Sequence, residues 1–295
     1  MEQRRYGRTG HLSSVAILGG AAFSRNVSPA EAEAGFALAM ERGVNHLDIA
    51  PAYGDAERLI GPLLEPVRDR WFVGCKTGRA SADGARAQLE ESLQRLRIDR
   101  FDLYQLHGVT DLAELDRRSG AAEVMLAARD EGLTTYVGIT GHDLGAPRAH
   151  LEAVRRFDLD SVLFPIYPRV WADPVYRADA MELLAECQRR DVGVMVIKAG
   201  ARQPWAGEAP DRNTWYRPYT DLASLTRGVR FALSIPGVCG FCTPGDLALL
   251  PTVLDAAEAA GAAGPMSPEE QEAAMAAMGD EALIFPLAEH AVLRR

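Results

Sequence analysis

Short apolar runs alternate along the chain with longer stretches in which apolar residues follow helical spacing. The apolar runs lie at positions 15–22, 45–50, 71–77, 101–108, 136–142, 161–167, 193–199 and 238–243. Between two of these runs, Leu89, Leu93 and Leu96 recur at i, i+4 and i+7, which places them on one face of a helix. The alternation predicts eight β-strands, each followed by a helix.

Eight such βα units favour a parallel sheet that is covered by helices. Strands that are apolar almost throughout are typical of these sheets, because both faces are buried. Eight units in 295 residues predict a closed (β/α)8 TIM barrel, which we expect to form one domain over residues 1–295. The alternative is an open doubly wound sheet, which usually has a glycine-rich phosphate turn after its first strand. Gly19 and Gly20 lack the GxGxxG spacing of that turn.

Two segments fall outside the repeat. Residues 202–219 follow the seventh strand and are rich in proline and aromatic residues. In a barrel they lie on the rim, where they either cover a pocket or form an ordered surface excursion. Residues 265–295 form a tail with a helix start at Ser267 and a predicted helix to about Ala282, which we expect to pack on the barrel.

Composition and charge narrow the choice of partners. A hydrophobic fraction of 47% and a charged fraction of 25% are ordinary for a soluble globular protein. The net charge of −9 argues against nucleic acid or an anionic membrane as a partner, although it allows a local basic pocket for a phosphate. No stretch approaches the ~20 apolar residues of a membrane helix, and no signal peptide is evident. We therefore expect a cytoplasmic protein, and the pattern indicates no particular oligomer.

The cysteines do not suggest a metal site. They are Cys75, Cys187, Cys239 and Cys242. Only Cys239 and Cys242 are close in sequence, and no second pair completes a zinc site. We expect all four to be core residues.

Residues 45–54, which read NHLDIAPAYG, combine a buried strand with two chemically active side chains. Asp48 lies near the end of the strand, where an unpaired carboxylate is costly. Pro51 and Gly54 end the strand and turn the chain, which leaves Tyr53 on the loop beyond it. A strand carboxylate followed five residues later by a loop tyrosine indicates a functional site.

The next two predicted strands also end in polar groups. The third ends with Lys76 and the fourth with His107. The carboxyl ends of neighbouring barrel strands meet on one rim, where barrel active sites form. A lone lysine or histidine at a strand end is more often structural, but four complementary groups at consecutive ends favour a shared site. We therefore expect Asp48, Tyr53, Lys76 and His107 to converge.

These side chains are suited to protonating a carbonyl oxygen. A tyrosine is a weak acid with a pKa of ~10, and a buried lysine beside it is expected to lower the pKa of Tyr53 towards neutral pH. Asp48 would keep Lys76 charged. His107 can donate a hydrogen bond to the same substrate oxygen. Since none of the four supplies a hydride, the reductant has to come from a cofactor.

The order of motifs resembles the aldo-keto reductase family over nearly the whole chain. The matching segments are YGRTGHLSSVAILGGAAF, LDIAPAYG, VGCKTG, DLYQLHG, VGITGH, VMVIKAG and SIPGV. The resemblance implies an N-terminal hairpin before the barrel and a catalytic tetrad of Asp48, Tyr53, Lys76 and His107. It also implies NADPH as the hydride donor, with NADH as the alternative, and aldehydes or ketones as substrates.

The chain departs from the family where the nicotinamide carboxamide is usually held. The family commonly has Ser-Asn after the fifth strand and Gln on the sixth, and these places read Thr140-Gly141 and Leu163 here. The resemblance implies cofactor contacts from Thr140 and Gly141, and His142 is a further candidate.

Two later segments also differ from the family pattern. The tyrosine that often stacks on the nicotinamide after the seventh strand is replaced by Ile197 and Lys198, and Lys198 is a candidate for a cofactor phosphate. After the eighth strand the family usually supplies basic residues for the adenosine 2′-phosphate. Residues 243–258 of this chain contain no arginine or lysine and carry Asp246 instead. Gly245 and the following helix start can offer N–H groups to a pyrophosphate. The choice between NADPH and NADH stays open.

Other functions remain compatible with these residues. The same tetrad could serve net non-redox chemistry on a bound cofactor, such as sugar dehydration or epimerisation. A barrel that senses a nucleotide without catalysis is a third possibility, although it has no need of a buried acid–lysine pair. A Schiff-base aldolase is disfavoured, because Asp48 would keep Lys76 charged.

Overall fold

Eight parallel strands form a closed barrel, in the ring order β12-β3-β4-β5-β6-β7-β8-β9. We describe a computed structural model over residues 1–285. The strands are β3 (Ala16–Gly19), β4 (His46–Asp48), β5 (Phe72–Thr77), β6 (Phe101–Leu106), β7 (Thr134–Thr140), β8 (Ser161–Pro165), β9 (Gly193–Ile197) and β12 (Val238–Cys242). All eight coincide with the apolar runs, so the predicted TIM barrel is confirmed.

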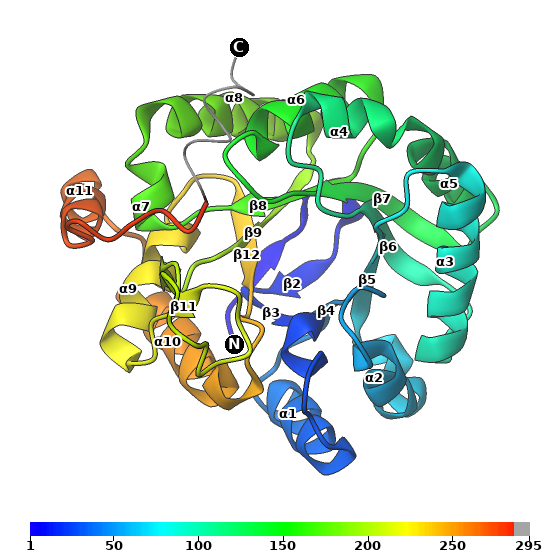
Figure 1. The fold of residues 1–295 in the computed structure, drawn as a ribbon, viewed down its shortest axis with the longest axis horizontal. Coiled ribbons are helices and arrows are strands. Elements are labelled where there is room, and N and C mark those ends of the chain that lie inside the picture. The colour runs from blue at the N-terminus through cyan, green and yellow to red at the C-terminus, as the bar shows by residue number, and fades with distance from the viewer. Residues whose placement is uncertain (286–295) are drawn as a thin grey trace.

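Helices surround the ring of strands, as Figure 1 shows. They are α1 (Pro29–Glu41), α2 (Ala56–Leu64), α3 (Ala82–Leu96), α4 (Leu112–Arg117), α5 (Ser119–Asp130), α6 (Ala146–Arg156), α7 (Pro168–Trp171), α8 (Pro174–Arg190), α9 (Leu222–Leu233) and α10 (Leu250–Ala263). The start of α1 illustrates the local code: Ser28 and Glu31 form a capping box, and Pro29 stands at the first helical position.

The N-terminal hairpin covers one end of the barrel. Strands β1 (Gln3–Arg5) and β2 (Leu12–Ser14) pair antiparallel. Tyr6, between them, is fully buried and packs against Phe72 in the barrel interior, with ring centroids 5.8 Å apart. Large apolar side chains therefore fill this end, and the hairpin that the resemblance implied is present.

The described part of the tail packs on the barrel. Helix α11 (Pro268–Ala276) begins with a capping box of Ser267 and Glu270, as predicted, but it ends before Ala282. Beyond it the chain stays buried without helical structure at Leu283 and Ile284. Gly279, with φ of +52°, takes the left-handed conformation that commonly ends helices, which explains the earlier end. The rest of the predicted tail lies outside the described residues, and the single-domain assignment over 1–295 stays a prediction.

Over residues 1–285, no helix combines the length and the hydrophobicity that crossing a bilayer requires.

His46 on β4 gives the first prediction. Its ring is fully buried, with Nδ1 2.9 Å from Ser13 Oγ, and burial holds its pKa well below 6.5. Below pH 6.5 the unfolded chain binds a proton on this imidazole and the folded chain does not. The free energy of unfolding therefore decreases as the pH is lowered. We expect this fall to be ~1.4 kcal/mol per pH unit shallower in His46→Gln than in the unmodified chain, as measured by urea unfolding between about pH 5 and 6. Equal dependence of the free energy of unfolding on pH in the two proteins would contradict a neutral, buried His46.

Candidate active site

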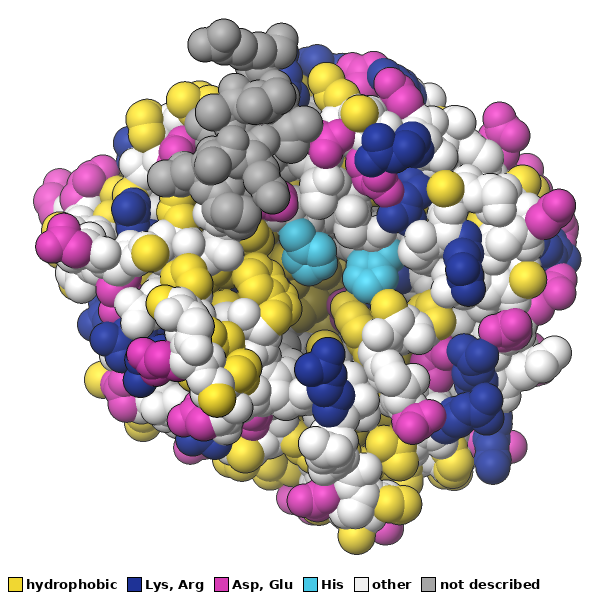
Figure 2. Space-filling model, viewed as in Figure 1, with side chains coloured by type: hydrophobic (Ala, Val, Ile, Leu, Met, Phe, Trp, Pro, Cys, Tyr) yellow, Lys and Arg dark blue, Asp and Glu magenta, His cyan; other side chains and the backbone are white. Residues whose placement is uncertain are grey.

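The carboxyl ends of the strands open into a pocket of about 870 Å³. Figure 2 looks onto this end of the barrel and shows a central hollow, with apolar side chains on its wall and histidine side chains at its rim. Asp48, Tyr53, Lys76 and His107 all line the pocket. The structure therefore brings together the four side chains that the sequence placed at consecutive strand ends.

Asp48 and Lys76 form a buried ion pair at the base of the pocket. Lys76 Nζ lies 2.7 Å from Asp48 Oδ2, and both side chains are at most 5% exposed. The ammonium also donates to the Ile49 carbonyl at 3.1 Å and lies 3.5 Å from Tyr53 Oη. Strands β4 and β5 are neighbours in the barrel, so backbone pairing brings the two charges together. Three oxygens thus surround one ammonium.

Two side chains that the sequence analysis did not identify hold the Asp48 carboxylate. Gln105 Nε2 donates to Oδ1 at 3.3 Å, and Cys242 Sγ donates to Oδ2 at 3.6 Å. Glycines stand beside Gln105 on both neighbouring strands, and the one at 138 gives its side chain room. A Cβ at Gly138 would stand 3.3 Å from Gln105 Cγ, and one at Gly74 would stand 3.6 Å from its Nε2. In the sequence, the feature that could have identified Gln105 is a polar glutamine within an otherwise apolar strand.

The pKa of Tyr53 differs from the expectation. Burial raises it to about 12, and the charge of Lys76 lowers it by less. Burial would lower the pKa of Lys76, but Asp48 and Tyr53 outweigh burial and leave it raised. Removal from water therefore decides the direction for the phenol, while the paired carboxylate decides it for the ammonium. Tyr53 keeps its proton at neutral pH, and Lys76 keeps its charge.

His107 and a second histidine stand beside Tyr53. The His107 ring is nearly perpendicular to the Tyr53 ring, with centroids 5.7 Å apart, and the His142 ring is 6.3 Å from that of His107. Burial and the nearby Lys76 hold the pKa of His107 well below its usual value. Burial and Lys198 lower the pKa of His142 to about 3. Both rings are therefore neutral, with one N–H to donate.

The five residues proposed for cofactor contacts separate into two groups. Thr140, His142, Lys198 and Gly245 line the pocket. Gly141 does not line it, and a Cβ at Gly141 would stand 2.2 Å from the Val109 carbonyl oxygen. The glycine is thus required by close packing behind the pocket wall.

The long loop after the seventh strand covers the pocket. It runs from β10 (Ala201–Gln203) to β11 (Arg217–Pro218), which pair antiparallel. Its pocket-lining residues are Trp205, Pro210, Arg212, Asn213, Thr214, Trp215 and Tyr216. Asn213 connects the loop to other parts of the rim: its N–H donates to Asp246 at 2.8 Å and its side chain donates to Ser24 at 3.2 Å. Of the two alternatives for residues 202–219, the covering loop is correct.

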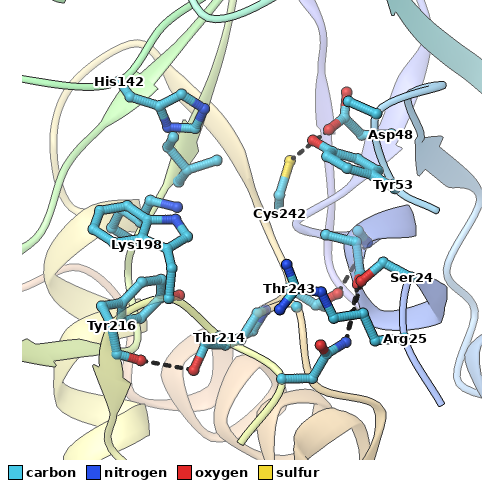
Figure 3. A pocket seen from close by; sticks show the side chains of 18 of the residues that line it. Ser24, Arg25, Asp48, Tyr53, His142, Lys198, Thr214, Tyr216, Cys242 and Thr243 are labelled. Carbon is cyan, nitrogen blue, oxygen red and sulfur yellow. Dashed lines mark hydrogen bonds between the residues drawn. The ribbon is translucent and has the colours of Figure 1, made fainter. Parts of the chain in front are cut away.

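Two arginines at the pocket were not identified from the sequence. Arg25, after β3, and Arg212, on the covering loop, both line it. Figure 3 shows the side chain of Arg25 extending into the pocket near Thr243. Asp48 is the only acid among the described residues that line the pocket, and Lys76 neutralises it. Positive charge absent after the eighth strand is therefore present on other loops.

Asp246 after β12 has a structural role. Besides accepting from Asn213, it accepts the N–H of Ala248 at 3.0 Å and caps a short 3₁₀ turn, Leu247–Leu249. This carboxylate therefore already accepts from one N–H group, that of Ala248, at the helix start that was expected to face a pyrophosphate. Over the described part of the chain, no group of three or more His, Cys, Asp or Glu side chains is arranged to hold a metal ion.

Comparison with protein families and curated relatives gives a consistent result. A model of the aldo/keto reductase family matches residues 16–208. L-galactose dehydrogenase of Arabidopsis thaliana is 28% identical over 178 residues, which cover 55% of this chain and 56% of that protein. The chain spans about half the length of the first curated relatives it matches.

Solved structures share the fold over almost the full chain. An aldo-keto reductase from Bacillus halodurans in its holo form has a TM-score of 0.72 at 20% identity, covering 98% of this chain and 99% of that one. An aldo-keto reductase from Klebsiella pneumoniae, in complex with NADP and acetate, has a TM-score of 0.68 at 19% identity, covering 97% and 96%. At these identities the likeness establishes the fold.

The ion pair gives the second prediction. Asp48→Asn leaves the Lys76 ammonium buried without its carboxylate, so we expect the free energy of unfolding to fall by about 3–5 kcal/mol in urea unfolding. The double variant Asp48→Leu/Lys76→Met removes both charges and should recover most of that loss. A single variant that loses less than about 1 kcal/mol would show that the charge is solvated in some other way.

Proposed function

The chain belongs to the aldo/keto reductase family, and on that basis we propose that it transfers hydride reversibly between a nicotinamide cofactor and an aldehyde or ketone. The observation that carries the proposal is the position of Lys76, whose ammonium lies between Asp48 at 2.7 Å and Tyr53 at 3.5 Å. A charged lysine beside a protonated phenol at the mouth of a barrel is suited to protonating a carbonyl oxygen.

Each of the four residues has a role in this proposal. Tyr53 is the general acid, because its raised pKa keeps the hydroxyl protonated until a carbonyl oxygen gains negative charge. Lys76 then stabilises the phenolate that remains, and Asp48 keeps Lys76 charged and directed at Tyr53. His107, neutral and beside Tyr53, donates a hydrogen bond to the same oxygen. In the alcohol-oxidising direction the same groups accept the proton.

A reduced nicotinamide, when bound, supplies the hydride. The residues present fit such a group. The pocket is within the usual size range for small-molecule sites. Thr140 offers a hydroxyl, and Nδ1 of His142 is buried without a hydrogen-bond partner. Arg25 and Arg212 bring charge suited to phosphates. The Klebsiella pneumoniae structure with NADP supports the same cofactor here, with NADH as the alternative.

Aromatic side chains on the covering loop suit a polyhydroxylated carbonyl substrate. Trp205, Trp215 and Tyr216 line the pocket, and Trp215 is 54% exposed. Such rings provide a flat apolar surface with polar edges. The Arabidopsis thaliana relative is named for L-galactose, which also favours a small sugar or related aldehyde as the substrate.

The third prediction concerns cofactor binding. Titration with NADPH and with NADH, followed by nicotinamide fluorescence, should give saturable binding of at least one of them. Oxidation of that cofactor should then depend on added aldehyde, with an aldose compared against a simple aliphatic aldehyde. Binding without turnover of any carbonyl would favour a nucleotide-sensing barrel, and binding of neither would reject hydride transfer.

The fourth prediction tests the acid. Tyr53→Phe removes the hydroxyl proposed as the proton donor and keeps the aromatic ring. We expect kcat to fall by about 10²- to 10⁴-fold, while the Kd of the cofactor changes by less than about twofold. Retention of more than about a tenth of kcat would identify a different proton donor. Tyr136→Phe is the matched control, because it removes a phenol hydroxyl that lies outside the pocket and donates to the Thr9 carbonyl at 2.9 Å.

A further inference from the structure

Lysine is almost absent from this protein. The chain has 32 basic residues, and only Lys76 and Lys198 are lysine; the other 30 are arginine. Both lysines line the same pocket. Because arginine supplies the charge everywhere else, these two places combine a cation with a small, compact head group. For Lys76 the ion pair with Asp48 explains why a lysine stands there. The proposed function does not yet explain the lysine at position 198.

Lys198 is placed by the end of β9, on the far side of the pocket from the catalytic pair. β9 and β5 are four strands apart in a ring of eight, so Lys198, just after β9, and Lys76, on β5, belong to opposite sides of the barrel. Figure 3 shows Lys198 and Tyr216 on one wall and Asp48 and Tyr53 on the other. The Lys198 backbone has φ of +77°, a left-handed conformation that is costly for a residue with a Cβ.

The Lys198 ammonium lies against two aromatic rings. Nζ is 4.9 Å from the ring centroids of both Trp215 and Tyr216. Such contacts stabilise a cation only modestly. Within residues 1–285 no carboxylate is within ion-pair distance of Lys198, whereas Lys76 has Asp48 at 2.7 Å. Burial lowers the pKa of Lys198 to about 8. The charge is therefore one that a ligand anion would stabilise.

The surroundings favour an anion at this place. Arg25 and Arg212 line the same pocket and have no ion pair in the described part of the chain, and the Nε of Arg212 is buried without an acceptor. With Asp48 neutralised by Lys76, the pocket carries excess positive charge in a chain whose net charge is −9. Such a pocket attracts oxyanions.

We propose that Lys198 binds an oxyanion of the ligand in this pocket, either a phosphate of the cofactor or a carboxylate of the substrate. The proposal rests on the proposed function for the identity of these ligands. The aromatic rings hold the ammonium from one side, and the anion approaches it from the open pocket. Lys198 is thus a binding residue, distinct from the tetrad on the opposite wall.

The first experiment removes the charge. Lys198→Met keeps a long side chain against both rings, and Lys198→Arg keeps the charge. Arg58→Met, which removes an exposed cation from α2 outside the pocket, is the control. We measure Kd for NADPH and NADH by fluorescence, and KM for succinic semialdehyde and for butyraldehyde, which lacks the carboxylate.

The pattern of losses identifies the anion. A loss of about tenfold or more for both cofactors in Lys198→Met assigns the pyrophosphate, and a loss for NADPH alone assigns the 2′-phosphate. A rise in KM for succinic semialdehyde alone assigns a substrate carboxylate. Lys198→Arg should recover part of the loss. Changes below about twofold in all four constants would overturn the proposal.

A second measurement does not depend on catalysis. Because the chain has only two lysines, acetylation by N-hydroxysuccinimidyl acetate can be followed at Lys198 by peptide mass spectrometry. We expect NADPH, sodium pyrophosphate or succinate to slow acetylation of Lys198 more than that of the N-terminal amine. Protection by pyrophosphate or succinate in a protein that binds neither cofactor would support the anion site while rejecting hydride transfer. Absence of protection by any of the three would overturn the anion site.

Discussion

The buried contact between Asp48 and Lys76 is the interaction on which the rest of the site depends. An ammonium with 2% of its side chain exposed is tolerable only because a carboxylate lies 2.7 Å away. Gln105 and Cys242 in turn fix that carboxylate. Four strands of the barrel, β4, β5, β6 and β12, therefore hold one pair of charges, and this pair sets the electrostatic environment of Tyr53. A small displacement of any of these strands would change the position of the charges beside the Tyr53 hydroxyl.

The two ends of the barrel have different roles, one in packing and one in forming the pocket. At one end the N-terminal hairpin and Tyr6 supply apolar packing, which suits stability. At the other, several strand ends deliver polar groups to the same cavity, and the covering loop adds aromatic and positively charged side chains. The glycines at 138 and 141 contribute to this arrangement, since a Cβ at either position would collide with neighbouring atoms.

Much of this arrangement could be read from the sequence, because strand periodicity and strand order together fix which residues share a rim. The eight strands and the convergence of Asp48, Tyr53, Lys76 and His107 follow from that logic. Arg25 and Arg212 could not be found in the same way, since their positions depend on how loops fold over the mouth. The pKa direction of Tyr53 was also wrong, because the degree of burial is a property of the folded pocket. Gln105 was missed because its partner lies two strands away in the barrel.

The hairpin that plugs the barrel has a kinetic consequence. With Tyr6, Phe72 and their apolar neighbours filling the far end, the interior of residues 1–285 offers no passage through the barrel. Under the proposed function, the cofactor and the carbonyl substrate share this pocket and enter it through one opening, which the loop ending at β11 lines. The ligand that lies deeper would then bind first and leave last, so the residence time of the outer ligand would limit the exchange of the inner one.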